Sequence, residues 1–515
     1  MADAVISATI RVALETAASL ATDRIGMLCG FKKDVASMTR TLSFINALLA
    51  DAEERQQNQD RGVQEWLKSL EEVAYDAGNV LDELNYESLR LPITGMGGLG
   101  KTTLAKSIYN NHQIDGHFQK KIWVCVSKKV PIVELFKLIL VHLTGEKVEV
   151  DVRDVIVGKI RNHLEGKRYF LVLDDVWDDD QALWDDFFTT LKGLHPTNGS
   201  WCLVTTRLRM MENEAYPLGK LPDDLCWSIL KEKVVGGEEE PDELKAIKER
   251  VIKRCDGLPL AASVIGGLLS LKRKEEWQPI LENRLLSLSA GGDHVMQILK
   301  LSFDNLPSPY IKKCFAYCSI FPKDSEIERN MLIELWMAEG FLQADLNSQM
   351  IMEEIGMNYL RILLQSSLLE ETRNYQGTCY KMHDLVHDLA ESMSKSTKVI
   401  IDRDTSILDN GNQIRYLATV SFAVDLSGDM LMKLKNLYVL NLSPTRTREL
   451  PVSIGKLIHL RYVNLERSSI SILPDSLCKL YNLQTLTLSE SSVKHLPKGM
   501  CNLISLRHLH YYIDD

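Results

Sequence analysis

Apolar residues recur at helical spacing through roughly the first 90 positions of the chain. Leu70, Val73, Ala77, Leu81 and Leu84 follow one another at intervals of three and four, with acidic residues between them. This spacing places them on one face of an amphipathic helix. The pattern predicts an N-terminal helical bundle, of coiled-coil type, over residues 1–90.

Short apolar runs replace this spacing between residues 91 and 220. The runs read LPIT, KIWVCVS, RYFLVLDD and WCLVTTR, and the segments between them are long enough for helices. Strands that are apolar on both faces are typical of a parallel sheet covered by helices. Helical spacing returns afterwards, as in LKAIKERVIKRC and MLIELWMAEGFL. We therefore expect an α/β domain over residues 91–220, followed by two mostly helical domains over 221–290 and 291–395.

The last part of the chain repeats every 23 residues. Three series of positions carry this period: Leu437, Leu460, Leu483 and Leu506; Leu440, Val463, Leu486 and Leu509; and Pro451, Pro474 and Pro497. The unit LxxLxL, followed by an irregular return and LP, is typical of leucine-rich repeats, whose short strands form one curved sheet. We expect such repeats over residues 396–515. Strand alternation predicts that one face of the strands is exposed on the concave side and forms a contact surface: Tyr462, Asn464, Glu466, Thr485, Thr487 and Ser489.

Length and charge limit the classes of function. The chain has 515 residues, too many for one hydrophobic core, so the fold class is a multidomain α and α/β protein. The formal net charge is −10, and residues 291–395 hold nine Lys or Arg against fifteen Asp or Glu. This balance argues against nucleic acid as a partner. Because Asp3, Arg11 and Glu15 interrupt the N-terminal apolar stretch, we expect neither a secretory signal nor a membrane span, and a cytoplasmic location.

A phosphate-binding motif follows the first predicted strand. Residues 95–102 read GMGGLGKT, which matches GxxxxGK[ST] between a strand and a helix. In such a loop the glycines let backbone N–H groups face phosphate oxygens, a lysine neutralises the outer phosphates, and a hydroxyl binds Mg²⁺. The predicted nucleotide-binding residues of the loop are Gly95, Gly97, Gly98, Gly100, Lys101, Thr102 and Thr103.

Two further motifs end apolar runs. Asp174 and Asp175 end the run YFLVLDD, where Asp174 is placed to hold Mg²⁺ together with Thr102 and Asp175 to orient a water molecule. Arg207 ends LVTTR and could sense the terminal phosphate, or it could be an ordinary surface arginine. Ligands of open parallel sheets bind beyond the carboxyl ends of the strands. We therefore expect the three motifs to meet at one crevice.

Taken together, these motifs resemble those of the plant coiled-coil nucleotide-binding leucine-rich-repeat (CC-NB-ARC-LRR) disease resistance proteins. GMGGLGKTT and LVLDDVW look like the family's phosphate loop and metal-binding strand. GLPLA at 257–261 resembles a motif of its helical domain, CFAYCSIFPKD at 314–324 its winged-helix signature, and MHD at 382–384 the motif that follows. The resemblance implies a P-loop NTPase domain over 91–220, a helical ARC domain over 221–290, a winged-helix domain over 291–395 and leucine-rich repeats thereafter.

The resemblance also implies a switch. ADP holds a closed form, and exchange for ATP gives an open form that oligomerises and signals in defence, with at most slow ATP hydrolysis by Asp174 and Asp175. In this scheme Pro259 contacts the base and His383 approaches the β-phosphate. Taken without the family, Pro259 is a good first-turn helix residue and His383 an ordinary polar helix residue. Implied partners are a pathogen effector or guarded host protein, further copies of the chain, and a membrane contacted by the N-terminal helix of the active form.

Several family features are shortened or altered. The segment that covers adenine and ribose is not found before Leu91, the chain after Arg207 is short, and about three clear repeats are present. An acidic motif of the fourth bundle helix is reduced to residues 78–82, and Arg461 and Arg507 could be its partners on the repeats. These features suggest a truncated member and leave open a non-switching decoy or partner protein with weakened nucleotide binding. A transcription regulator and a turnover ATPase are less consistent with the acidic winged-helix region and with the lack of a recognisable substrate motif.

Overall fold

The computed structural model describes most of the chain beyond the predicted bundle. The described residues are 90–511, apart from 127–129, 146–149, 179, 195–199, 208–215, 282–293, 344–349, 375–376, 395–397, 402–413, 420–427, 444 and 446. The helical bundle predicted over 1–90, and with it the acidic motif at 78–82, therefore lies outside the described residues, except for Arg90. Contacts divide the chain into two compact units, Met1–Gly95 with Lys101–Pro217, and Met96–Gly100 with Leu218–Asp515.

A parallel sheet forms the centre of the first unit, as the apolar runs predict. Its described strands lie in the order β2-β3-β4-β1-β5, and every described pairing is parallel. The strands are β1 (Arg90–Thr94), β2 (Lys120–Cys125), β3 (Tyr169–Val176), β4 (Trp201–Thr206) and β5 (Tyr216–Pro217). The interior strand β3 is buried over nearly its whole length because both faces of the sheet are covered.

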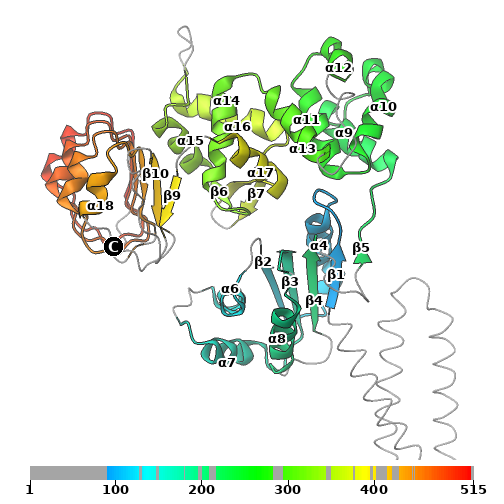
Figure 1. Ribbon diagram of the computed structural model, residues 1–515, viewed down its shortest axis with the longest axis horizontal. Coiled ribbons are helices and arrows are strands. Elements are labelled where there is room, and N and C mark those ends of the chain that lie inside the picture. Colours follow the sequence, from blue (N-terminus) through cyan, green and yellow to red (C-terminus); the bar gives the residue numbers. More distant parts are fainter. Residues whose placement is uncertain are drawn as a thin grey trace, which may run out of the picture. The chain divides into compact units, whose positions relative to one another are not determined.

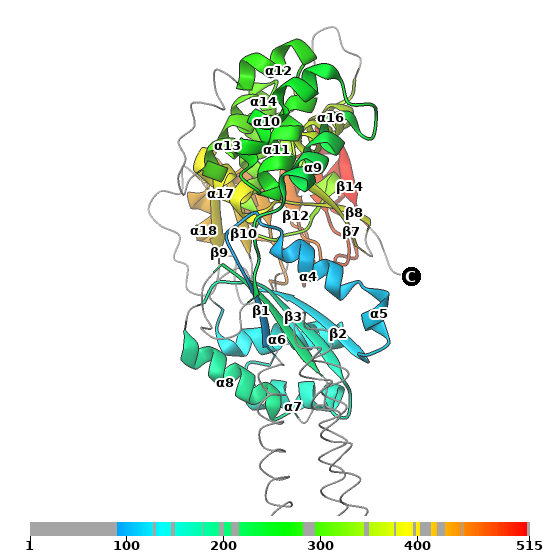
Figure 2. The same cartoon turned by 90° about the vertical axis from the view of Figure 1, so that its right-hand side faces the viewer.

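Helices cover this sheet from two sides (Figures 1 and 2). They are α4 (Lys101–Tyr109), α5 (His112–Asp115), α6 (Ile132–Thr144), α7 (Arg153–Leu164) and α8 (Gln181–Lys192). Alternate residues of β2 and β3, such as Val124 and Leu171, share one core with α6, α7 and α8. The intervening residues Trp123 and Phe170 instead contact Tyr109 of α4, with ring centroids 5.3 and 5.9 Å away. The period of two along each strand thus sorts the side chains between the two helical layers.

The second unit begins with four helices and continues into a mixed segment. The helices are α9 (Asp223–Val235), α10 (Asp242–Cys255), α11 (Pro259–Ser270) and α12 (Lys274–Ile280). The mixed segment contains α13 (His294–Asp304), α14 (Pro309–Tyr317), the 3₁₀ helix η3 (Cys318–Ile320), β6 (Ile327–Glu328), α15 (Arg329–Ala338), α16 (Met352–Gln365), β7 (Glu370–Asn374), β8 (Gly377–Lys381) and α17 (Asp384–Met393). Its strands form an antiparallel sheet in the order β6-β8-β7. Helices joined to a small antiparallel sheet are the arrangement expected of a winged helix.

Leucine-rich repeats complete the second unit. The described strands pair in parallel in the order β14-β13-β12-β11-β10-β9. They are β9 (Lys398–Ile401), β10 (Tyr416–Thr419), β11 (Val439–Asn441), β12 (Tyr462–Asn464), β13 (Thr485–Thr487) and β14 (His508–His510). The return segments contain α18 (Gly428–Lys433) and the 3₁₀ helices η5 (Val452–Lys456), η6 (Asp475–Lys479) and η7 (Lys498–Asn502). The register of Tyr416 with Val439 extends the period of 23 one strand earlier than the leucine pattern does.

The predicted exposure of the concave face is wrong at four of the six positions, whereas Glu466 and Ser489 are partly exposed. Tyr462, Asn464, Thr485 and Thr487 are all less than 10% exposed. Tyr462 belongs to the same hydrophobic core as Trp336 of α15. The winged-helix region therefore covers this part of the concave face, which a strand pattern considered by itself could not reveal.

Among the described residues, no helix combines the length and the apolar character needed to cross a bilayer.

Candidate nucleotide-binding site

The glycine-rich loop leaves the carboxyl end of β1 and leads directly into α4. Gly95, Gly98 and Gly100 have φ angles of 152°, 80° and 90°, which other residues rarely adopt. Gly98 also lies against Leu260, whose N–H donates to Gly98 O at 3.3 Å. A Cβ at Gly98 would lie 3.1 Å from Leu260 Cβ. Backbone conformation thus favours glycine at positions 95, 98 and 100, and close packing also favours it at position 98, apart from any role in phosphate binding. Gly97 lies in the same loop and is half-buried.

Lys101 is the first residue of α4 and is buried, with 7% of its surface exposed. Its Nζ donates a 2.8 Å hydrogen bond to the carbonyl oxygen of Gly95. The side chain thus folds back towards the start of the loop, while the first N–H groups of α4 follow the end of the loop. These N–H groups have no partners within the helix and attract anions. Thr103, on the next position but one, is exposed.

Hydroxyl groups fix the carboxylate of Asp174, which is 3% exposed at the end of β3. Thr102 Oγ1 donates to Asp174 Oδ1 at 2.9 Å, and Thr205 Oγ1 donates to the same oxygen at 2.5 Å. A carboxylate and a threonine hydroxyl are hard oxygen ligands, the donor type that Mg²⁺ requires. Thr102 and Asp174, predicted as metal ligands from separate motifs, therefore lie in direct contact.

The second acid, Asp175, has a different environment. Its φ is 56°, unusual for a residue with a Cβ, and the pairing of β3 with β4 changes register between Leu173 and Val176. Asp175 N donates to Thr205 Oγ1 at 2.8 Å, and Asp175 Oδ2 accepts from Trp177 Nε1 at 2.6 Å. The irregular backbone turns Asp175 away from the regular alternation of the strand, as is common at functional sites.

Arg207 follows β4 and contacts the same residues. Its Nε lies 3.7 Å from Asp175 Oδ1, and its guanidinium carbon lies 4.4 Å from the centroid of the Trp177 ring. Arg207 is therefore held beside the acidic pair instead of projecting from the surface as an isolated arginine. The structure brings together Gly95, Lys101, Thr102, Asp174, Asp175 and Arg207 beyond the carboxyl ends of β1, β3 and β4 in the first unit.

Pro259 and His383 belong to the second unit. Pro259 is the first residue of α11, where its missing N–H leaves no helical hydrogen bond unmade, and it precedes the Leu260 that contacts Gly98. His383 is the N-cap of α17, and its Nδ1 accepts a 3.2 Å hydrogen bond from Leu385 N. The N-cap contact gives His383 a structural role at the start of α17, and its predicted approach to the β-phosphate stays a prediction.

The sequence reasoning missed two residues of this site. Thr205 contacts both acidic residues: its hydroxyl group donates a hydrogen bond to Asp174 Oδ1 and accepts one from Asp175 N. Trp177 links Asp175 to Arg207. The signal for Thr205 was a hydroxyl residue near the end of a strand that neighbours the acidic strand. The sequence carried no comparable signal for Trp177.

The partner predicted for Arg461 and Arg507, the acidic motif at 78–82, lies outside the described residues, and the contacts that the structure describes for these arginines are with the second unit. Arg507 forms a bidentate ion pair with Glu353 of α16, at distances of 3.1 Å. Arg461 Nη1 donates to Ala338 O at 3.1 Å. In the described part of the chain both arginines thus join the repeats to the winged-helix region.

Four family models match the chain. They describe the Rx N-terminal domain over residues 9–120, the NB-ARC domain over 73–240, the disease resistance protein winged helix domain over 320–390, and a leucine-rich repeat region over 413–514. The matched regions follow the order that the motifs predict.

Curated relatives agree with these matches. The "Putative disease resistance protein RGA1" of Solanum bulbocastanum is 31% identical and covers 88% of this chain. "Disease resistance protein RGA2" of the same plant is 37% identical over 72% of the chain, and "Disease resistance protein RPP13" of Arabidopsis thaliana is 34% identical over 63%. The chain spans 56%, 38% and 40% of these three relatives, respectively. The matches and the geometry of the phosphate loop confirm the resemblance, and the chain belongs to the plant CC-NB-ARC-LRR family of disease resistance proteins.

Proposed function

We propose that the protein is an intracellular immune receptor of plants in which ADP and ATP set the signalling state during defence against pathogens. The observation that carries the proposal is the contact of Thr102 with Asp174, beside a lysine folded back towards the start of the phosphate loop. This arrangement places one cation and one pair of hard oxygen ligands side by side, the groups that a nucleotide phosphate and its Mg²⁺ require.

The proposed roles follow from these positions. Lys101 and the loop glycines Gly95, Gly97, Gly98 and Gly100 would bind the phosphates, and Thr103 would extend this contact from the first turn of α4. Thr102 and Asp174 would hold Mg²⁺, which would neutralise phosphate charge. Asp175 would orient a water molecule for slow hydrolysis, and Arg207 would respond to the terminal phosphate. Pro259 would contact the base and His383 the β-phosphate.

The domain division is part of the proposal. Residues 91–220 would bind nucleotide, 221–290 and 291–395 would form the helical and winged-helix domains, and 396–515 the repeats. The element bounds support this division, since α9 starts at Asp223 and α13 at His294. Proposed partners are a pathogen effector or guarded host protein, other copies of the activated chain, and a membrane in the active state of an otherwise cytoplasmic protein.

Titration with two nucleotides tests the base-binding side of the proposal. The proposed phosphate contacts do not involve the adenine-covering segment that is expected, from the sequence, to be absent before Leu91, whereas adenine would lose its cover. Loss of base stacking costs about 1–3 kcal/mol, so we expect ADP to bind with an affinity about 10- to 100-fold below that of a fully enclosed site. We expect ADP and GDP to bind nucleotide-free protein within about 10-fold of each other in calorimetry with Mg²⁺. Nanomolar binding of ADP with strong rejection of GDP would contradict the predicted exposure of the base.

Substitution of Asp384 tests the switch. Asp384 opens α17 and is 8% exposed, directly after His383. If this segment makes contacts that exist only in the closed state, Asp384→Val shifts the population towards the open state. We expect release of a fluorescent ADP analogue to be about 10-fold faster, within the usual range of coupling between sites. Glu391→Val, an exposed substitution on the same helix, is the control. Release of the analogue by Asp384→Val at the control rate would exclude a sensing role for this segment.

A further inference from the structure

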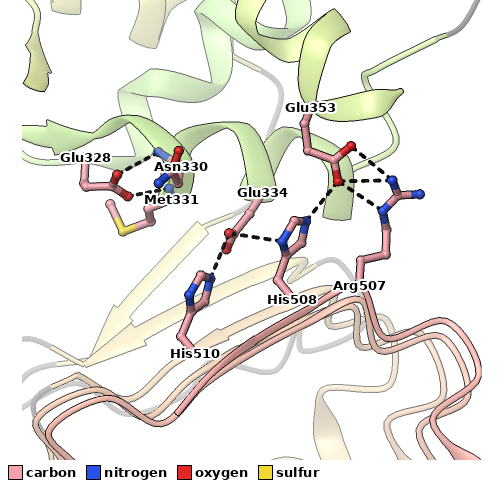
Figure 3. Close-up of polar contacts among 8 residues, drawn as sticks. All are labelled: Glu328, Asn330, Met331, Glu334, Glu353, Arg507, His508 and His510. Carbon is pink, nitrogen blue, oxygen red and sulfur yellow. Dashed lines mark hydrogen bonds and ion pairs between the residues drawn. The ribbon is translucent and has the colours of Figure 1, made fainter. Parts of the chain in front are cut away.

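Two histidines of the last described strand face the winged-helix region (Figure 3). His508 and His510 lie two residues apart on β14 and therefore point to the same face of the sheet. Their rings are stacked with centroids 6.2 Å apart and planes within 5° of parallel. The side chains of His508 and His510 are 21% and 34% exposed, so an ion could reach them from solvent.

A buried glutamate lies between these two rings. Glu334, on α15, is 4% exposed. Its Oε1 lies 2.9 Å from His510 Nε2 and 3.7 Å from His508 Nδ1. One donor atom from each of the three residues lies within 4.8 Å of the other two. A single carboxylate oxygen therefore approaches two imidazole nitrogens, an arrangement that a proton or a metal ion could stabilise.

The spacing of these atoms fits a metal ion closely. Zinc binds nitrogen and carboxylate oxygen at about 2.0–2.2 Å, and in a tetrahedral site this separates the ligand atoms by about 3.4 Å. The distances from Glu334 Oε1 to His510 Nε2 and His508 Nδ1, 2.9 and 3.7 Å, lie on either side of this value. The remaining separation, between the two histidine nitrogens, is at most 4.8 Å.

The other ring nitrogen of His508 lies against a carboxylate. Its Nε2 is buried and lies 3.2 Å from Glu353 Oε1 on α16. Glu353 is in turn held by Arg507 through two contacts of 3.1 Å (Figure 3). Metal-binding histidines nearly always direct their other ring nitrogen towards a carboxylate or carbonyl group, which fixes the tautomer. With Nδ1 on a metal, the proton of His508 would reside on Nε2 and face Glu353.

We propose that Glu334, His508 and His510 form a binding site for a divalent transition-metal ion, with Zn²⁺ as the preferred occupant. Two imidazoles and one carboxylate favour zinc and its neighbours over Mg²⁺ or Ca²⁺, which prefer oxygen ligands. Three protein ligands leave a fourth position for water. The site is separate from the phosphate loop and does not use its residues.

An ion at this site would join two distant parts of the chain. Glu334 and His510 are 176 positions apart in sequence, one on α15 of the winged-helix region and the other on the repeats. A metal ion could bind all three residues only when α15 and β14 are in contact. Its binding would therefore stabilise the state in which they are in contact. Zinc should therefore hold the repeats against the winged-helix region.

The test is zinc binding by the full chain, measured by equilibrium dialysis with Zn²⁺ alone and metal analysis. The hydrogen bond to Glu334 raises the pKa of His510, so a proton competes for Nε2 and the dialysis is done at about pH 8. We expect wild type to bind one Zn²⁺ more tightly than the double variant with His508→Ala and His510→Ala. Removal of a residue that only supports a metal ligand lowers metal affinity about 10- to 100-fold. We expect the double variant to lose more zinc affinity than this. Zinc should also raise the melting temperature of wild type but not that of the double variant.

Controls separate this site from other zinc-binding positions. His495→Ala removes an exposed histidine of the repeats and should bind zinc as wild type does. Glu334→Gln removes the ligand charge from α15 with little change in size, and it decides the question if the double variant does not fold. Equal zinc affinity in wild type and Glu334→Gln, or a zinc-induced melting shift that survives both substitutions, would overturn the proposal. In that case the three residues form an imidazole–carboxylate ion-pair cluster only.

Discussion

Replacing Lys101 with arginine is expected to abolish retention of nucleotide. Lys101 is buried, and its Nζ hydrogen bonds to Gly95 O within the loop. A guanidinium group is larger and planar, and it cannot take the place of a compact ammonium group among backbone N–H groups. Loss of a charge-assisted contact and displacement of the loop should weaken ADP binding by at least about 100-fold, or about 2.7 kcal/mol.

The matched control for this prediction is Lys106→Arg. Lys106 is exposed on the same helix, α4. Its replacement by arginine is therefore the same chemical change at a position outside the loop. Binding is measured by calorimetry with Mg²⁺ on protein freed of nucleotide, and folding is followed by circular dichroism. An affinity of Lys101→Arg equal to that of Lys106→Arg would show that Lys101 does not contact the phosphates.

Replacing Gly267 with alanine is expected to destabilise the second unit strongly. A Cβ at Gly267 of α11 would lie 2.5 Å from Gln365 O and 2.7 Å from Ser366 C, at the end of α16. Both are backbone atoms, so the clash can be relieved only by moving one helix away from the other. Overpacking that forces the backbone to shift costs about 1–3 kcal/mol, and we expect a value at the upper end because both contacts are with backbone atoms. The helical and winged-helix regions would lose their close contact.

Gly158→Ala is the control, because a Cβ at this position of α7 has no neighbour within 4 Å. Alanine in a helix interior is favoured over glycine by about 0.5–1 kcal/mol, so this variant should melt at the same temperature as wild type or slightly higher. Hydrogen exchange locates the effect, with faster exchange in α11 and α16 expected only for Gly267→Ala. Wild-type exchange in both helices would contradict the packing described here.

Local motifs were predictable from the sequence because they depend on short-range chemistry. The spacing of Gly95 to Thr102 placed a loop between β1 and α4, and the apolar run before Asp174 gave a buried strand. The period of 23 predicted the strands from β11 to β14. In each case the residues that define the element are neighbours in sequence or recur at a fixed interval.

Features that depend on long-range packing were not predictable in the same way. Tyr462 and Thr485 follow a strand alternation that indicates an exposed face, yet the winged-helix region buries them. Thr205 became recognisable only when β3 and β4 were seen to be neighbours. Similarly, HLH at 508–510 is an ordinary strand sequence until Glu334 is placed against it. Contacts between residues so far apart in sequence cannot be predicted from the local pattern of a single sequence.

The most direct measurement of the central claim is identification of the nucleotide carried by the purified protein. The full chain is purified without added nucleotide, denatured, and the released small molecules are separated by chromatography against ADP, ATP, GDP and GTP standards. We predict that an adenine nucleotide, mainly ADP, is released from wild type and from Lys106→Arg, and that Lys101→Arg releases none. Release of equal amounts by all three proteins, or of no nucleotide by wild type together with no ADP binding in calorimetry, would contradict a nucleotide-controlled switch.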